Sequence, residues 1–95
     1  MSISRKYVAV EDQDGSGMFC LGIFYDHKTA VGAIMEEIWD FRQSYQEEGC
    51  IFEHTELSMM EGEGGEIMTL RFKAPCWEKE MKYYYYILYS DMEMD

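Results

Sequence analysis

The sequence predicts an α+β domain in which one long helix packs on one face of an antiparallel sheet of about five strands, in the order β-β-α-β-β-β. Three observations predict this class. One segment repeats apolar residues at spacings of three and four, short apolar segments of strand length lie on either side of it, and later segments alternate apolar and polar residues. The 95 residues suit one domain. We expect residues 1–90 to form it and residues 91–95 to be an acidic flexible tail.

Two strands are predicted before the helix. Residues 7–10 (YVAV) are typical of a short strand, and a polar turn containing glycine follows at residues 11–17. Residues 18–25 (MFCLGIFY) form an almost unbroken apolar run, which is typical of a central strand buried on both faces. Cys20 lies within this run, so we expect its side chain in the core.

The helix is predicted over residues 27–48. Asp26 precedes it as an N-cap, because its carboxylate can accept hydrogen bonds from the amides of the first turn. Gly49 follows it as a C-cap. The apolar residues that share one stripe of this helix are Val31, Ile34, Ile38, Phe41 and Tyr45.

Three strands are predicted after the helix. Residues 51–58 and 66–73 alternate with the period of a strand, and the loop at residues 60–65 joins them. A helical turn is expected over residues 77–82. The aromatic segment 83–89 (YYYYILY) predicts the last strand. Alternate tyrosines should pack beneath the helix, while their neighbours face solvent or a partner.

The negative charge is concentrated in one third of the chain. The formal net charge is −11. Residues 36–66 hold ten acids and one base, whereas the segments before and after this third each have an excess of one acid. Such a distribution indicates an acidic face. It also disfavours direct binding of nucleic acid, although the tyrosine run resembles a base-stacking platform.

The outer side of the predicted helix carries an acidic row. At about 100° per residue, Glu36, Asp40 and Glu47 lie opposite the apolar stripe. Trp39 flanks the row, and tryptophan is enriched at protein interfaces. A solvated helix face is the other interpretation, and both stay open. The predicted partner-binding residues are Glu36, Trp39, Asp40, Gln43, Glu47, Glu48, Glu61 and Glu63.

No catalytic residue, metal site or cofactor is predicted. The turn at Asp12 and Asp14 matches the start of a calcium loop, but Ile23 stands where the bidentate glutamate is needed. Cys50 and His54 lie four residues apart, which on a strand is about 13 Å and too far for one zinc ion. An enzyme or ligand binder that uses Cys20, Cys50 or His54 in a cleft is a minor alternative.

The sequence also gives expectations about the compartment. The first residues contain no apolar segment typical of a secretory signal, and no apolar run is long enough to span a bilayer. The three cysteines are widely spaced and odd in number, which does not indicate a disulfide framework. We therefore expect a cytoplasmic protein.

In size, charge and α+β content, the whole chain resembles small acidic proteins of phages and mobile elements, including anti-CRISPR proteins. The resemblance implies an inhibitor that occupies the basic nucleic-acid channel of a larger enzyme, such as a CRISPR effector nuclease, by presenting carboxylates in place of phosphates. The predicted partner is therefore a basic protein surface. The alternative is a self-associating structural domain, in which the tyrosine-rich last strand pairs across a homodimer interface.

Overall fold

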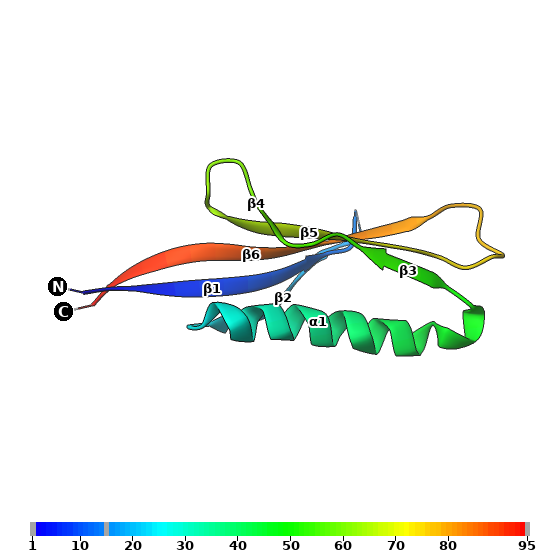
Figure 1. Ribbon diagram of the computed structural model, residues 1–95, viewed down its shortest axis with the longest axis horizontal. Coiled ribbons are helices and arrows are strands. Elements are labelled where there is room, and N and C mark those ends of the chain that lie inside the picture. Colours follow the sequence, from blue (N-terminus) through cyan, green and yellow to red (C-terminus); the bar gives the residue numbers. More distant parts are fainter. Residues whose placement is uncertain (1, 15, 95) are drawn as a thin grey trace.

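The computed structural model describes residues 2–14 and 16–94, apart from the side chains of residues 2–4 and 91–94. Within them, one helix packs on one face of a six-stranded antiparallel sheet, as the sequence predicts (Figure 1). The sheet order is β2-β1-β6-β5-β3, and β4 pairs with β5 beside this path. The elements are β1 (Ser2–Asp12), β2 (Met18–Phe24), α1 (His27–Ser44), the 3-10 helix η1 (Gln46–Glu48), β3 (Ile51–His54), β4 (Ser58–Met59), β5 (Gly65–Lys73) and β6 (Met81–Met94).

The long ribbon of β1 and β6 extends the sheet beyond the helix. The two strands pair continuously from Ser2 opposite Met94 to Asp12 opposite Tyr84 (Figure 1). The helical turn expected over residues 77–82 is wrong, because β6 already begins at Met81. The backbone of residues 91–94 continues this strand where an acidic tail was expected, and Asp95 lies outside the described residues. Pairing with a distant strand supplies these hydrogen bonds, and local composition does not reveal it.

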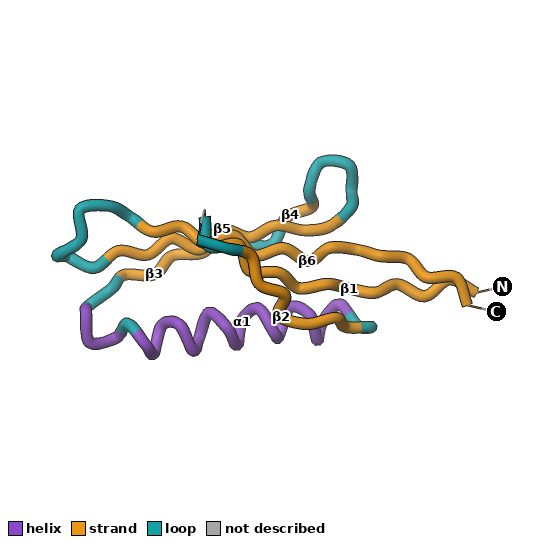
Figure 2. The backbone as a smooth tube through the Cα atoms, turned by 180° about the vertical axis from the view of Figure 1, so that it is seen from behind, coloured by secondary structure: helices purple, strands orange, loops and turns teal. Residues whose placement is uncertain are grey.

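Strand β2 is at an edge of the sheet, so the expectation of a central strand buried on both faces is wrong. Its exposed side chains include Met18 (64 %), Phe19 (50 %) and Ile23 (56 %). Cys20 is exposed as well, not in the core as expected. An apolar run shows that a strand can be buried, but it does not show how many neighbours the strand has. Figure 2 shows the sheet from the side on which β2 lies.

Helix α1 begins as predicted and ends earlier. The Asp26 carboxylate accepts from the Thr29 backbone amide at 3.3 Å and from the Thr29 hydroxyl at 2.9 Å. The α-helix ends at Ser44, and η1 continues the chain to Gly49, whose φ of 69° is left-handed. Glycine adopts this conformation without the steric cost of a Cβ. At the other end, His27 Nε2 lies 2.6 Å from Glu66 Oε2, which joins the first turn to β5.

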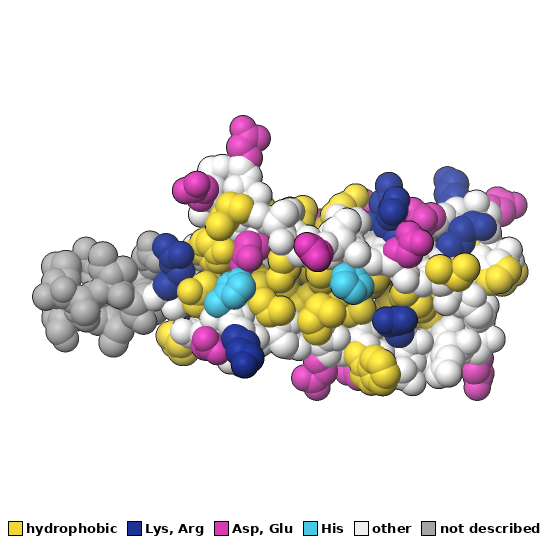
Figure 3. Space-filling model, viewed as in Figure 1, with side chains coloured by type: hydrophobic (Ala, Val, Ile, Leu, Met, Phe, Trp, Pro, Cys, Tyr) yellow, Lys and Arg dark blue, Asp and Glu magenta, His cyan; other side chains and the backbone are white. Residues whose placement is uncertain are grey.

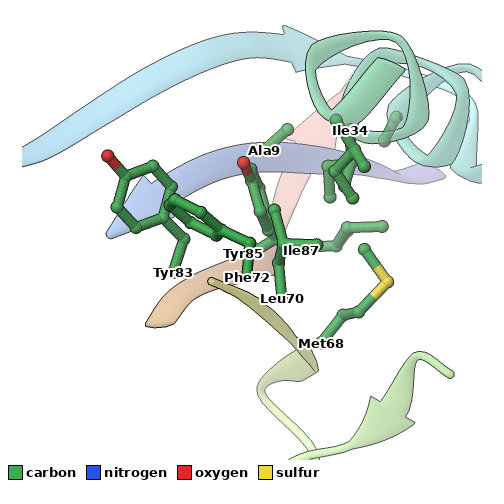
Figure 4. Packing of buried hydrophobic residues seen from close by; sticks show 10 residues of the cluster. Ala9, Ile34, Met68, Leu70, Phe72, Tyr83, Tyr85 and Ile87 are labelled. Atoms are coloured by element: carbon green, nitrogen blue, oxygen red, sulfur yellow. The ribbon is translucent and has the colours of Figure 1, made fainter. Parts of the chain in front are cut away.

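The core lies between α1 and the sheet (Figure 4). Tyr83 and Tyr85 of β6 point into it, whereas Tyr84 and Tyr86 are only partly buried on the other face. The predicted alternation of the tyrosines is therefore confirmed. Each fully buried large apolar side chain stabilises the fold by about 1.5–3 kcal/mol. The other buried members of the cluster are Ala9, Ala30, Ile34, Ile38, Met68, Leu70, Phe72 and Ile87.

The strand predicted over residues 51–58 is divided into β3 and β4. Strand β3 ends at His54, and the chain pairs with β5 again at Ser58. Thr55 holds the interruption in place, since its amide donates to the Thr69 carbonyl at 3.0 Å and its hydroxyl accepts from the Thr69 amide at 2.9 Å. The side-chain hydroxyl replaces one backbone acceptor of a regular ladder, which lets the chain leave the sheet.

Replacement of Gly65 by alanine tests the close approach of β5 to β6. A Cβ at this position would clash with the Ile87 carbonyl oxygen and lie 3.1 Å from Leu88 Cα, and both atoms belong to the backbone. We expect Gly65→Ala to lower the free energy of unfolding by about 1–3 kcal/mol, as overpacking does elsewhere. Gly64→Ala is the matched control, because an added Cβ there meets nothing within 4 Å. Equal urea-unfolding midpoints for the two variants would contradict this account.

Candidate protein-interaction site

The two flanks of the helix, one towards each edge of the sheet, carry different side chains. On one flank, the Arg42 guanidinium lies 5.8 Å from the centre of the Phe52 ring of β3. On the other, Glu37 interacts with Glu11 of β1. Because β3 and β2 are at opposite edges of the sheet, the flank that carries Glu36, Glu37 and Asp40 faces the β2 side. We call these three residues the acidic flank.

The helical part of the predicted site is exposed. The side chains of Glu36 and Asp40 are exposed on the acidic flank, and Gln43 is exposed further along the helix. Trp39 is 59 % exposed and lies towards β3, where it borders a shallow pocket of about 220 Å³ with Arg42 and Phe52. Glu47 and Glu48 are exposed in η1.

The structure does not bring Glu61 and Glu63 to the helix. Both lie between β4 and β5, in a loop that projects from the side of the sheet away from α1 (Figure 1). Glu63 has a φ of 57°, and with Gly62 at 88° it forms the tight turn at the loop tip. Figure 3 shows acidic side chains along the outer edge of the helix and on the projecting loop, with hydrophobic surface between them. The acids of residues 36–66 therefore form two separate surfaces.

A carboxylate pair, which the sequence did not predict, joins the buried Glu11 of β1 to the partly buried Glu37 of the acidic flank. Glu11 is 3 % exposed, and its Oε1 accepts from Gln13 Nε2 at 2.6 Å. Burial raises the pKa of Glu37, and the charge of Glu11 and a hydrogen bond with it raise it further, with smaller contributions from Asp40 and Glu36. Glu11 follows Ala9 with the period of two, which places both side chains on the helix-facing side. The same period could have predicted the burial of Glu11 from the sequence, but the predicted strand ended at residue 10.

Tyr85 extends this pair into the core. Its side chain is fully buried, and its hydroxyl has no hydrogen bond of good geometry among the described residues. Burial raises the pKa of Tyr85 strongly, and the charges of Glu11 and Glu37 raise it further. The raised pKa keeps the hydroxyl neutral at physiological pH.

Among the described side chains, no base forms an ion pair with the acidic flank. The ion pairs formed by described side chains include His27 with Glu66 and Arg71 with Glu53, and both lie away from this flank. Arg42 is the base in the last turn of α1, and it extends over Phe52 on the opposite flank. The acidic flank thus has its charges available to a cation from outside the chain.

An aromatic pocket lies beyond the end of the helix. It has a volume of about 470 Å³, a floor formed by Phe72 and Tyr83, and walls formed by Tyr45 and Trp77. The rings of Tyr45 and Trp77 meet edge to face with centroids 5.8 Å apart. An apolar side chain of a partner would fit such a pocket, which opens close to the acids of η1. No local pattern predicts this pocket, because its residues come from three separate segments.

Among the described residues, the side chains considered as metal ligands do not gather into a site. Asp12 Oδ1 accepts from the Asp14 amide at 3.1 Å, and this hydrogen bond belongs to the hairpin turn between β1 and β2. In the part of the chain that the structure describes, no three His, Cys, Asp or Glu side chains gather as metal ligands would. Burial raises the pKa of the Cys50 thiol, with further contributions from Glu48 and Cys76. A raised pKa disfavours the thiolate that nucleophilic catalysis needs.

The middle of the last strand is paired on both sides. From Tyr84 to Leu88, β6 pairs with β1 on one side and with β5 on the other. A second copy therefore has no access to the backbone of this segment in the folded chain. Any contact made by the tyrosines with a partner uses the side chains of Tyr84 and Tyr86 on the uncovered sheet face.

Comparisons with known proteins add no family to this picture. No protein-family model matches the chain, and neither a curated protein nor a solved structure matches it. The described residues contain no helix with both the length and the apolar character needed to cross a bilayer.

Replacement of Glu37 by glutamine tests the carboxylate pair. The raised pKa means that the folded state binds the proton more tightly than the unfolded chain does, whose ordinary value is 4.5. Stability contributed by this proton is present at low pH and is lost as the pH rises through the folded pKa. We therefore expect Glu37→Gln to raise the melting temperature at neutral pH, and this advantage to shrink as the pH falls towards 4.5. Glu56→Gln, at an exposed position whose charge does not act on Glu37, should show neither effect, and a pH-independent gain at Glu37 would contradict the assignment.

Thiol labelling tests the minor alternative of a reactive cysteine. The raised pKa of Cys50 predicts slower reaction with an aromatic disulfide reagent than at the exposed Cys20 at neutral pH. The difference should narrow as the pH approaches and passes the ordinary thiol value of 9.0. Variants that each retain one cysteine identify the reacting thiol. Fastest labelling at Cys50 would indicate an activated thiol and restore the catalytic alternative.

Proposed function

We propose that this protein is a non-enzymatic binding protein whose acidic helix surface engages a basic surface of another protein. The observation that supports it most is the acidic flank of α1, in which Glu36 and Asp40 are exposed and Glu37 lies beside the buried Glu11. Among the described side chains, no base forms an ion pair with this flank. A helix that needed these residues only for solvation would gain stability from interspersed bases at the spacing of four, and this flank has none.

A nucleic-acid-handling enzyme, such as a CRISPR effector nuclease, is the proposed partner. Glu36 and Asp40 are four residues apart on a helix, which separates them by about 6 Å along its axis. Phosphates along a nucleic-acid strand are several ångströms apart, so lysine and arginine side chains placed for phosphates can also meet carboxylates at this spacing. The resulting inhibition is competitive, because the acidic helix and the nucleic acid use the same basic groups.

Trp39 and the aromatic pocket add apolar contacts to this charged surface. Trp39 is exposed beside the acidic row, and the pocket of Tyr45 and Trp77 lies beyond the helix end. Interfaces gain most of their affinity from a few aromatic anchors, while charges at the rim mainly raise the association rate. In the proposed complex, the helix attracts the partner electrostatically, and burial of the Trp39 ring and filling of the aromatic pocket add apolar contacts.

The test compares the wild type with a charge-reversed helix. The variant Glu36→Lys, Asp40→Lys, Glu47→Lys changes three exposed side chains and no core contact. The matched control, Glu56→Lys, Glu61→Lys, Glu63→Lys, changes the net charge equally at exposed positions outside α1. Each form is immobilised on a resin and incubated at low salt with a lysate of the cells in which the protein acts. The captured proteins are identified, and their affinity for each form is then measured with purified proteins. We expect the helix variant to bind the captured basic protein roughly 10- to 100-fold more weakly, and the control to bind it nearly as well as the wild type.

Two further measurements decide the mechanism. Binding should weaken steeply with added salt, and duplex DNA or RNA should displace the captured protein, because both effects follow from shared basic groups. Equal capture by the wild type and the helix variant would reject the acidic helix as the site. Capture that salt and nucleic acid leave unchanged would reject the mimicry mechanism.

A further inference from the structure

Strand β2 has an unpaired backbone edge that is unusually apolar. Within the described part of the chain, β2 pairs with β1 alone. Its seven residues, MFCLGIF, contain no charged residue and no proline. Natural sheets usually protect such an edge with lysine, proline, a bulge or a very short strand, because an open edge invites pairing with another chain; of these, β2 has the bulge opposite Ala9 and Val10. The opposite edge shows this protection: β3 has four residues and carries Glu53.

Both faces of β2 carry apolar side chains. By register, Phe19 lies opposite Glu11 and Ile23 lies opposite Val8, so these two side chains lie on opposite faces of the sheet. Each is at least half exposed. The strand thus has the composition of a central strand and the position of an edge strand. An added strand beside β2 would give β2 a neighbour on both sides, as its apolar composition suits.

The surroundings of the edge specify the charge of the added strand. Glu37 of the acidic flank interacts with Glu11, and Glu11 is paired with Phe19 near the start of β2. Strand β2 ends at Phe24 and α1 begins at His27, so the two elements run in opposite directions and only the Phe19 end of β2 lies near the acidic flank. A strand placed beside β2 would have this end close to the acidic flank, and a basic side chain that faces the helix there would lie near Glu37 and its neighbours.

We propose that β2 accepts an extended, basic segment of the partner protein as an additional antiparallel strand. Backbone hydrogen bonds to β2 would hold the segment irrespective of its sequence, and the acidic flank would select lysine or arginine in the part of the segment beside Phe19. The bulge between Ala9 and Val10 of the β1–β2 register leaves residues 22–24 and 18–20 of β2 as two regular stretches for this pairing. The proposal rests on the proposed function for the charge of the partner, and on the unpaired edge for the mode of binding.

A second copy of this chain fits the same edge less well. Antiparallel pairing of β2 with β2 of a second copy requires a two-fold axis perpendicular to the sheet, which places both helices on the same side. The acidic flanks of the two copies would then face one another across the axis. Like charges at this separation repel, and each chain already carries a formal charge of −11.

Synthetic peptides test the proposal on the intact protein. The probe is a seven-residue peptide of alternating lysine and valine with blocked ends, matched to the length of β2. Two controls have the same length: one carries N-methyl groups on alternate backbone amides, and the other has glutamate in place of lysine. Binding is followed by fluorescence anisotropy, and the site by hydrogen exchange of individual backbone amides. We expect the lysine peptide to protect amides of β2 from exchange, and both controls to bind at least about tenfold more weakly.

The outcomes separate this proposal from the proposed function. Equal binding of the N-methylated peptide, or no protection of β2 at millimolar lysine peptide, would overturn strand addition while leaving a charged helix surface intact. Protection of β2 that persists in Glu36→Lys, Asp40→Lys would support strand addition and count against the acidic flank. Concentration-dependent protection of β2 without peptide, together with sedimentation as a dimer, would identify a second copy as the occupant and overturn the proposal.

Discussion

The pairing of β6 with β1 and β5 is the constraint on which the rest of the structure depends. It makes an aromatic segment the centre of the sheet, and the period of two then sends Tyr85 and Ile87 towards the helix. One helix covers the core part of that face, so the described residues form two layers and the outer side of α1 is also an outer surface of the protein. Acidic residues on that side are consequently presented to any partner without a rearrangement of the fold.

The acidic flank is held at an electrostatic cost that the fold does not require. Glu11 occupies a helix-facing position of β1, where an apolar residue would pack against the neighbouring core, and it raises the pKa of Glu37 by its charge. The Tyr85 hydroxyl beneath this pair adds a buried polar atom without a well-formed hydrogen bond among the described residues. Strain and unsatisfied polar groups of this kind concentrate where function competes with stability. The cluster therefore supports the interpretation that negative charge at this place is selected for binding.

Local features of the fold were predictable from the sequence, and long-range ones were not. The Asp26 cap, the apolar stripe of α1 and the alternation in β6 depend on residues within one turn or two strand positions of one another. The edge position of β2, the burial of Glu11 and the separation of Glu63 from the helix depend on which strands become neighbours. The composition of a segment shows whether its side chains can be buried. Whether they are buried depends on which strands and helices become its neighbours. The acidic residues predicted to bind a partner are exposed, and the sequence did not predict their division into two surfaces.

The unpaired edge and the acidic flank would act on different stages of binding. Charges on α1 act over a distance of about one Debye length and orient a basic partner before contact, so they govern the association rate. Backbone hydrogen bonds to β2 and burial of Phe19 and Ile23 form only after contact, so they govern dissociation. A surface with both features can capture a basic chain rapidly and hold it as a strand, whereas either feature alone gives a weak or an unselective complex. The adjacency of β2 to the acidic side of α1 is therefore a stronger indication of a binding site than the net charge of the chain.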